Sequence, residues 1–205
     1  MSDSKGQTNS SRPLPQFLFP AFTQGIVKMK SGNSNSAFLN YNMVEEQFIF
    51  GQKGIYYSLD KIEDIDTVTI QNRNFVLVNK VFLEVIVKGK ISIFTQHKSH
   101  YAPVGSQSAY GLTSQTNGPT AVSVVRGGNQ VRYLELPDNV TISSETVNWI
   151  SRNSKLNKFT NGKQFLKNFP EYEVQLKDFI KENKINFKVR EDLIKLGNFC
   201  NELVK

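Results

Sequence analysis

The 205-residue chain is poor in the side chains from which metal sites and nucleophilic centres are built. It contains one cysteine, Cys200, and two histidines, His97 and His100. A single cysteine excludes an intrachain disulfide, and so few Cys and His residues argue against a structural zinc site. Cys200 falls within an apolar stripe of helical spacing, which is typical of a small core residue. We therefore expect no metal site and no cofactor.

The motifs of several enzyme classes are also missing. The sequence has no Gly-rich loop ending in Gly-Lys-Ser/Thr, no His-Glu-x-x-His, no Cys-x-x-Cys and no Gly-x-Ser-x-Gly. Carboxylates do occur close together, at Glu45, Glu46, Glu63, Asp64 and Asp66. These acids adjoin turn sequences, so we interpret them as solvated loop residues rather than a glycosidase pair or a calcium site. The sequence offers no catalytic residues.

Long apolar runs are absent, although a membrane-spanning helix needs about 20 such residues. Residues 1–12 are polar and are predicted to be disordered. Two interpretations fit this beginning. The protein is cytoplasmic if Met1 is its natural start, or it is an exported protein whose signal peptide has been removed or replaced.

Charge is present in excess of one sign and is unevenly distributed. The formal net charge is +7, and the segment from Arg152 to Lys205 holds 12 Lys+Arg and 7 Asp+Glu. We expect a solvated helical surface with weak attraction to anionic membrane surfaces. We expect no nucleic-acid partner, because the aromatic and basic signature of an RNA-binding sheet is missing.

Short apolar segments separated by Gly, Asn and Ser clusters fill residues 25–97. This spacing predicts about eight antiparallel strands joined by tight turns, with Asn72-Arg73 and Asn79-Lys80 among the turns. Further hairpins are expected around Gly127-Gly128 and between "TVNWIS" and "NKFT". The preceding "RPLPQFLFPAF" is too rich in proline for a helix or a central strand. We expect it to pack across the domain through Phe17, Phe19 and Phe22.

The hydrophobic period changes to that of a helix after residue 160. Pro170 suits the first position of a helix. One predicted stripe consists of Tyr172, Leu176, Phe179 and Ile180, and a second consists of Val189, Leu193, Leu196, Cys200 and Leu203. The fold class is therefore α+β: an antiparallel β-meander that forms a barrel-like sheet or sandwich, with C-terminal helices packed on it.

We divide the chain accordingly into an N-terminal arm (1–16, disordered or extended), an antiparallel β domain (17–160) and a helical segment of the same domain (161–205). A long loop of small and polar residues is expected at 98–120, with the two histidines at its beginning. The loop is either a docking surface, with Tyr101, Tyr110 and Leu112 as contact residues, or a disordered connection. His97 and His100 could share a ligand only if the chain turned between them.

The chain resembles a family of uncharacterised exported proteins of Bacteroidota, periplasmic or associated with the outer membrane. The resemblance is carried by "FLFPAFTQGIVKMKSGNSNSAFLNYNMVEEQFIF", "LDKIEDIDTVTIQNRNFVLVNKVFLEVIVKGKISIF", "YGLTSQ" and "FTNGKQFLKNFPEYEVQLKDFIKENKINFKVREDLIKL". It covers the chain from about Phe17 to Leu196. The resemblance implies that the protein is exported across the inner membrane. It assigns no functional residues, because the family has no established activity.

Three classes of function remain open. The first is a non-enzymatic exported accessory or binding protein, a subunit of an envelope assembly with a protein partner in the cell envelope. The second is a module that binds a small ligand, a lipid or a glycan, in a β-lined cavity. The third is an enzyme of unrecognised type.

Overall fold

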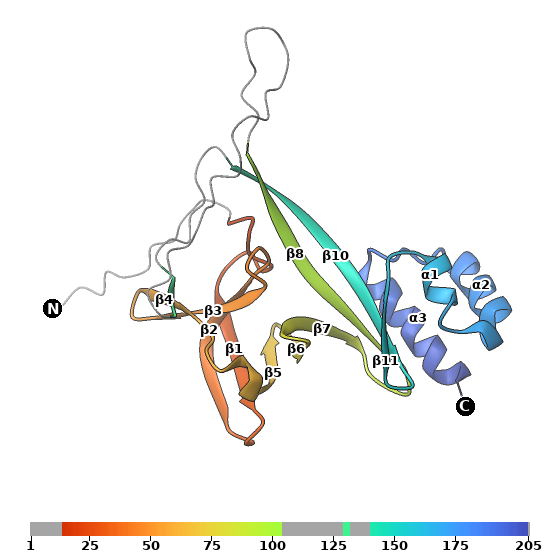
Figure 1. Cartoon of the computed structure of the whole chain (residues 1–205), viewed down its shortest axis with the longest axis horizontal. Coiled ribbons are helices and arrows are strands. Elements are labelled where there is room, and N and C mark those ends of the chain that lie inside the picture. The colour runs from red at the N-terminus through yellow and green to blue at the C-terminus, as the bar shows by residue number, and fades with distance from the viewer. Residues whose placement is uncertain (1–13, 104–128, 132–139, 205) are drawn as a thin grey trace, which may run out of the picture.

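The computed structural model describes residues 14–103, 129–131 and 140–204. Within them, eleven antiparallel strands form one sheet in the order β11-β10-β8-β7-β6-β5-β1-β2-β3-β4-β9 (Figure 1). The strands are β1 (Thr23–Met29), β2 (Ser34–Asn42), β3 (Gln47–Gln52), β4 (Ile55–Ser58), β5 (Ile65–Ile70), β6 (Arg73–Val78), β7 (Val81–Val87), β8 (Ser92–Pro103), β9 (Gln130–Val131), β10 (Val140–Arg152) and β11 (Lys155–Phe159).

Three α-helices follow the last strand and lie at one end of the sheet (Figure 1). They are α1 (Gly162–Leu166), α2 (Glu173–Glu182) and α3 (Arg190–Leu203). Pro170 begins a short 3-10 helix ahead of α2, at the position where its missing N–H group has no bond to lose. The predicted α+β class, with an antiparallel sheet and C-terminal helices packed on it, is confirmed, and the sheet curls without closing.

The tight turns form where the sequence supplies residues that tolerate a left-handed backbone. Asn79 and Lys80 both have positive φ between β6 and β7, as expected for a two-residue hairpin turn. The turn between β5 and β6 lies at Gln71 and Asn72, one residue before the predicted Asn72-Arg73. Arg73 is the first residue of β6 and pairs with Ile70 of β5, and its side chain makes an ion pair described below.

The predicted long loop at 98–120 begins later than the sequence suggests. Strand β8 continues through residues 98–103, and β10 pairs with it in unbroken register from Ser92 to Pro103. The polar composition of residues 98–103 did not indicate a strand. The β10 residues that pair with them, from Val140 to Glu145, are distant in the sequence, so no local pattern could reveal the pairing. The hairpin predicted around Gly127-Gly128 and the rest of the long loop lie mostly outside the described residues.

The proline-rich segment 14–22, which includes the described end of the predicted arm and is called the N-terminal arm from here on, packs on the sheet as expected. Phe17 and Phe19 are buried, while Phe22 is partly buried and contacts the rings of Phe17 and Tyr56. The Asn40 side chain accepts a hydrogen bond from the Phe19 amide and donates one to its carbonyl. The arm therefore gains backbone partners that its own prolines could not provide.

Two hydrophobic clusters lie on the sheet. The first lies under β1 to β7 and comprises Phe19, Val27, Leu39, Tyr41, Met43, Phe48, Ile65, Val68, Ile70, Phe75 and Phe82. The second joins β7, β8, β10 and β11 to the helices and comprises Ile86, Val87, Ile91, Ile93, Ile150, Phe159, Phe165, Phe169, Leu176, Ile185, Leu193, Leu196 and Cys200. The same sheet thus supports two separate cores.

The predicted helical stripes supply four of the thirteen buried residues of the second core, namely Leu176, Leu193, Leu196 and Cys200. Leu176 and Cys200 are fully buried, and burial raises the pKa of the Cys200 thiol to about 12, as suits a packed core residue. Phe179 is only partly buried and stacks on Phe199 with ring centroids 4.0 Å apart. Val189 is more than one-third exposed and precedes α3 rather than packing under it.

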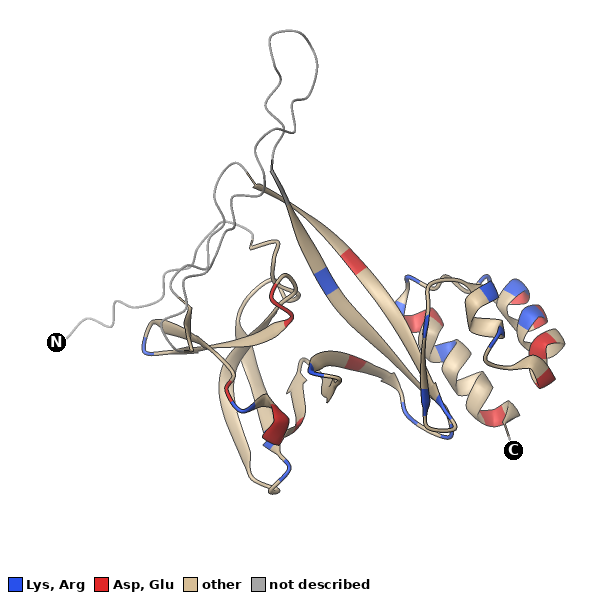
Figure 2. Cartoon of the chain, viewed as in Figure 1, with Lys and Arg blue, Asp and Glu red and all other residues tan. Residues whose placement is uncertain are grey.

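Charged side chains are rare in the strands and frequent in the helices and turns (Figure 2). Helix α2 carries both signs, with Lys177 and Lys181 among Glu173, Asp178 and Glu182. Mixed charge of this kind is typical of a solvated surface. Attraction of the basic end to anionic membranes stays a prediction. No helix in the described ranges is long and apolar enough to cross a membrane.

Gly197 sets how closely α3 approaches the sheet. A Cβ atom added there would lie 2.7 Å from Val87 Cγ2 and 3.1 Å from Ile93 Cδ1. Val87 is β-branched and stiff, so it cannot easily move aside. The glycine is therefore required by packing, although it lowers the helical propensity of α3.

We predict that Gly197→Ala destabilises the protein by about 1–3 kcal/mol, because overpacking outweighs the gain of about 1 kcal/mol in helix propensity. The neighbouring Asn198 is exposed, so Asn198→Ala should be neutral or slightly stabilising. Denaturant unfolding of both variants measures the difference. A stabilised Gly197→Ala variant would show that α3 does not pack on Val87 as described.

Candidate functional site

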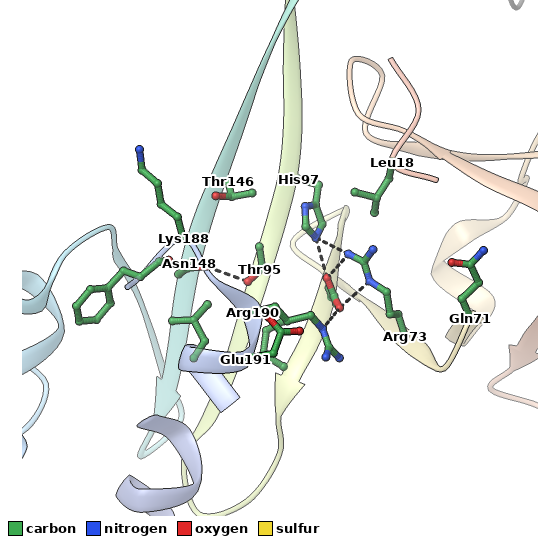
Figure 3. Close-up of a pocket in the computed structure, with 14 residues that line it drawn as sticks. Leu18, Gln71, Arg73, Thr95, His97, Thr146, Asn148, Lys188, Arg190 and Glu191 are labelled. Carbon is green, nitrogen blue, oxygen red and sulfur yellow. Dashed lines mark hydrogen bonds and ion pairs between the residues drawn. The ribbon is translucent and has the colours of Figure 1, made fainter. Parts of the chain in front are cut away.

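An open cavity of roughly 480 Å³ lies at the junction of the two cores, between the N-terminal arm and the beginning of α3 (Figure 3). We call this cavity the cleft. It is lined by Leu18, Gln71, Arg73, Glu84, Ile86, Thr95, His97, Thr146, Asn148, Phe187, Lys188, Arg190, Glu191 and Leu193. Apolar, polar and charged groups thus meet in one cavity.

Strand alternation places Glu84 at this junction. Phe82, Glu84 and Ile86 are alternate residues of β7 and share one face of the sheet. Phe82 belongs to the first core and Ile86 to the second. Glu84 therefore lies at the boundary, and its side chain is only 1% exposed.

Four hydrogen-bonding contacts surround the Glu84 carboxylate. Its Oε1 accepts from Arg73 Nε at 2.8 Å and from Arg190 Nε at 2.8 Å. Its Oε2 contacts Arg73 Nη2 at 2.5 Å and His97 Nε2 at 2.8 Å. The partners come from β6, β8 and α3, so one carboxylate connects three elements (Figure 3).

The Arg73 guanidinium is held in place by both charge and aromatic rings. It makes two bonds to Glu84 and lies 5.0 Å from the ring centroid of Phe19 and 5.6 Å from that of Phe75. A cation over aromatic faces is stabilised by the ring quadrupole. Arg73 therefore also fastens the N-terminal arm to the first core.

His97 Nε2 lies between two groups of opposite hydrogen-bonding character. Arg73 Nη2 is 3.1 Å away and is a donor, while the carboxylate oxygen of Glu84 is 2.8 Å away and is an acceptor. When Nε2 carries a proton it donates to Glu84, and when it does not it accepts from Arg73. His97 is thus bonded in either tautomer.

The second histidine lies elsewhere. His100 is well exposed, and its Nε2 lies 3.9 Å from Oε2 of Glu145. The chain does not turn between the two histidines, because both belong to the continuous strand β8. They therefore do not share a site, and the described residues hold no group of three His, Cys, Asp or Glu side chains that could bind a metal ion.

A neutral hydrogen-bond chain closes the helical side of the cleft. Thr95 Oγ1 donates to Asn148 Oδ1 at 2.8 Å, and Asn148 Nδ2 donates to the Phe187 carbonyl at 2.7 Å. Thr95 and Asn148 are paired residues of β8 and β10, whereas Phe187 lies in the segment between α2 and α3. The chain holds that segment against the sheet.

The candidate residues from the sequence lie only partly in this region. Of the proposed docking residues, Tyr101 is half-buried in β8, and its pKa is raised by burial and by the charge of Glu45. Tyr110 and Leu112 lie outside the described residues. Among the acids considered, Glu46 accepts a hydrogen bond from the Gln96 side chain, and Asp66 pairs with Lys28 at the surface.

Sequence reasoning missed Glu84, Arg73 and Arg190. Glu84 did leave a signal, since it is the only charged residue in the strand "VFLEVIV". An acid within an apolar strand is almost never fully buried unless it is paired. Its partner on α3, Arg190, is 106 residues distant in the sequence, so no local pattern could identify this pair.

The electrostatics of Glu84 follow from these contacts. Burial acts to raise the pKa of the Glu84 carboxyl. The hydrogen bonds from His97, Arg73 and Arg190, together with the charge of Arg73, outweigh burial and lower the pKa to about 2 from an ordinary 4.5. The ionised form is therefore stabilised by folding, and Glu84 is a poor proton acceptor at neutral pH.

We predict that the folded state loses stability as the pH falls from about 5 to about 2. A group whose pKa is lowered by folding stabilises the protein above its unfolded pKa and loses this contribution below it. The shift of Glu84 corresponds to roughly 3 kcal/mol. Denaturant unfolding measured across this pH range should show the loss.

Two variants isolate the effect. Glu84→Gln should be destabilised by about 3–5 kcal/mol at pH 7 and should be less sensitive to acid than the wild type. Glu182→Gln, at an exposed position of α2, should keep the wild-type pH dependence. Equal acid sensitivity of the wild type and Glu84→Gln would contradict the assignment.

Comparisons with protein-family models, with curated proteins and with solved structures gave no match to this chain.

Proposed function

We propose that the protein is a non-enzymatic binding protein whose ligand site is the cleft. The observation that carries this proposal is the position of an open cavity beside the buried, paired carboxylate of Glu84 at the junction of two cores. Of the three classes left open by the sequence, the geometry favours the module that binds a small ligand. An accessory role in an envelope assembly is compatible with it.

The size and lining of the cleft support ligand binding. Small-molecule sites usually have volumes of about 300–1,000 Å³ and combine apolar walls with a few fixed polar groups. Here Leu18, Ile86 and Leu193 supply apolar surface, while the Glu84 cluster and Asn148 supply fixed polar groups. The polar groups are ordered by one another, so a ligand would not have to order them.

The chemistry of the lining residues favours binding over catalysis. Both oxygens of Glu84 are engaged and its pKa is low, so it is a poor general base. The Thr95 hydroxyl donates to Asn148 rather than to a base that could activate it. Among the residues that line the cleft, no hydroxyl group donates a hydrogen bond to a carboxylate or a histidine that could act as its general base.

We predict that blocking the cleft removes a small molecule that otherwise copurifies with the protein. Thr146 lines the cleft, is exposed and makes no side-chain hydrogen bond within the described residues, so Thr146→Trp fills space at little cost to folding. Native mass spectrometry after gentle purification from cells that make the protein should detect bound mass in the wild type only.

The matched control is Ser143→Trp. Ser143 is exposed on the same strand and lies on its opposite face, three residues from Thr146. This variant should retain the bound mass. An absence of bound mass in all three proteins, or its retention in Thr146→Trp, would contradict the proposal.

The place of action is proposed from the family resemblance as the periplasm or the outer membrane. Fractionation of cells that make the protein should then recover it with the envelope, and recovery in the cytoplasm would contradict this placement. The loop containing Tyr110 and Leu112 stays a predicted docking surface for a protein partner.

A further inference from the structure

The Arg190 guanidinium keeps most of its hydrogen-bonding capacity unused. Only its Nε is bonded to Glu84, and neither Nη group has a hydrogen-bond partner in the described part of the chain. The side chain is 37% exposed and belongs to the lining of the cleft. A planar pair of N–H donors is therefore available to a molecule in the cleft (Figure 3).

The charges around the cleft favour an anion of low charge. The lining contains three cations, Arg73, Lys188 and Arg190, and two acids, Glu84 and Glu191, which leaves +1 when His97 is neutral. The cleft also opens at the N-terminal end of α3, where the helix dipole adds partial positive charge. A single negative charge would balance this set, whereas a dianion would exceed it.

The shape of the donor group and the apolar walls of the cleft narrow the chemical class of the ligand further. The fork of an arginine matches a carboxylate, with two parallel N–H···O bonds. Leu18, Phe187 and Leu193 line the same cavity and offer apolar surface to the rest of the molecule. Lys188 is exposed nearby and would attract the anion without fixing its orientation.

We infer that the ligand of the cleft is a small organic monocarboxylate with an apolar body, bound through the free Nη edge of Arg190. This inference rests on the proposed function and names the ligand class. Glu84 acts as a positioning residue: it accepts a hydrogen bond from Nε of Arg190 and thereby restricts the plane of the guanidinium, on a side chain that lines the cleft. Arg73 is more fully committed, with Nε and Nη2 both on Glu84.

Three probes test the charge and shape that the cleft requires. Sodium benzoate has the proposed carboxylate and apolar body, benzyl alcohol has the body without the charge, and inorganic phosphate has the charge without the body. Binding is followed by calorimetry and by NMR shifts of cleft residues in the full chain. Benzoate should bind at least about tenfold more tightly than either of the others.

Variants at Arg190 test the anchor. Arg190→Gln should weaken benzoate binding at least about tenfold, and so should Arg190→Lys, which keeps a positive charge but lacks the fork. Lys181→Gln removes the same charge from an exposed site on α2 and should leave the affinity within about twofold of the wild type. Thermal unfolding of each variant verifies that it is folded under the binding conditions.

The outcomes separate the ligand class from the proposed function. Equal binding of benzyl alcohol and benzoate, both lost in Thr146→Trp, would overturn the carboxylate assignment and leave the cleft as a binding site. Tighter binding of phosphate than of benzoate would overturn the claim that the ligand has an apolar body. Benzoate binding that is absent, or unchanged in both Arg190 variants, would overturn the inference.

Discussion

The burial of the Glu84 carboxylate is the constraint on which the arrangement of the sheet and helices depends. An ionised carboxylate that is 1% exposed must be paired, since an unpaired buried charge costs several kcal/mol. Its donors come from β6, β8 and α3, and no one of these elements could satisfy it alone. The carboxylate therefore helps to specify how α3 lies on the sheet. Apolar packing alone is non-directional and would define this orientation less precisely.

The same charge explains why the protein has two cores rather than one. An apolar residue at position 84 would join Phe82 to Ile86 and allow the two clusters to merge across β7. The charged cluster prevents this, and the polar Thr95 and Asn148 continue the boundary on β8 and β10. The cleft lies along that boundary, so the buried charge and the cavity beside it result from the same interruption of the apolar core. A buried ion pair is a poor source of stability compared with apolar packing, which makes a functional reason for its presence more persuasive.

The elements that depend on local sequence could be predicted, and those that depend on distant pairing could not. The strands β1 to β8 and the stripe of Leu193, Leu196 and Cys200 follow from periodicity and turn chemistry. The extension of β8 beyond residue 98 and the ion pair between Glu84 and Arg190 involve residues far apart in the sequence. Within the charged cluster, the sequence drew attention to His97 alone, and only as a metal ligand, which the scarcity of Cys and His argued against. Its contacts with Glu84 and Arg73 could not be predicted from local sequence.

Helix α3 brings the packing and the electrostatic constraints together. Arg190 and Gly197 are seven residues apart, close to two helical turns, so they lie on the same face of the helix. At Gly197 the helix backbone approaches Val87 too closely for any side chain, which fixes its distance from the sheet. At Arg190 the helix is held through a flexible side chain whose Nη groups have no hydrogen-bond partner among the residues that the structure describes. The packed end therefore sets the position of α3, and the charged end is where the proposed ligand would contact the helix. A molecule bound at Arg190 would strengthen the contact of α3 with the sheet without disturbing the core that Gly197 makes possible.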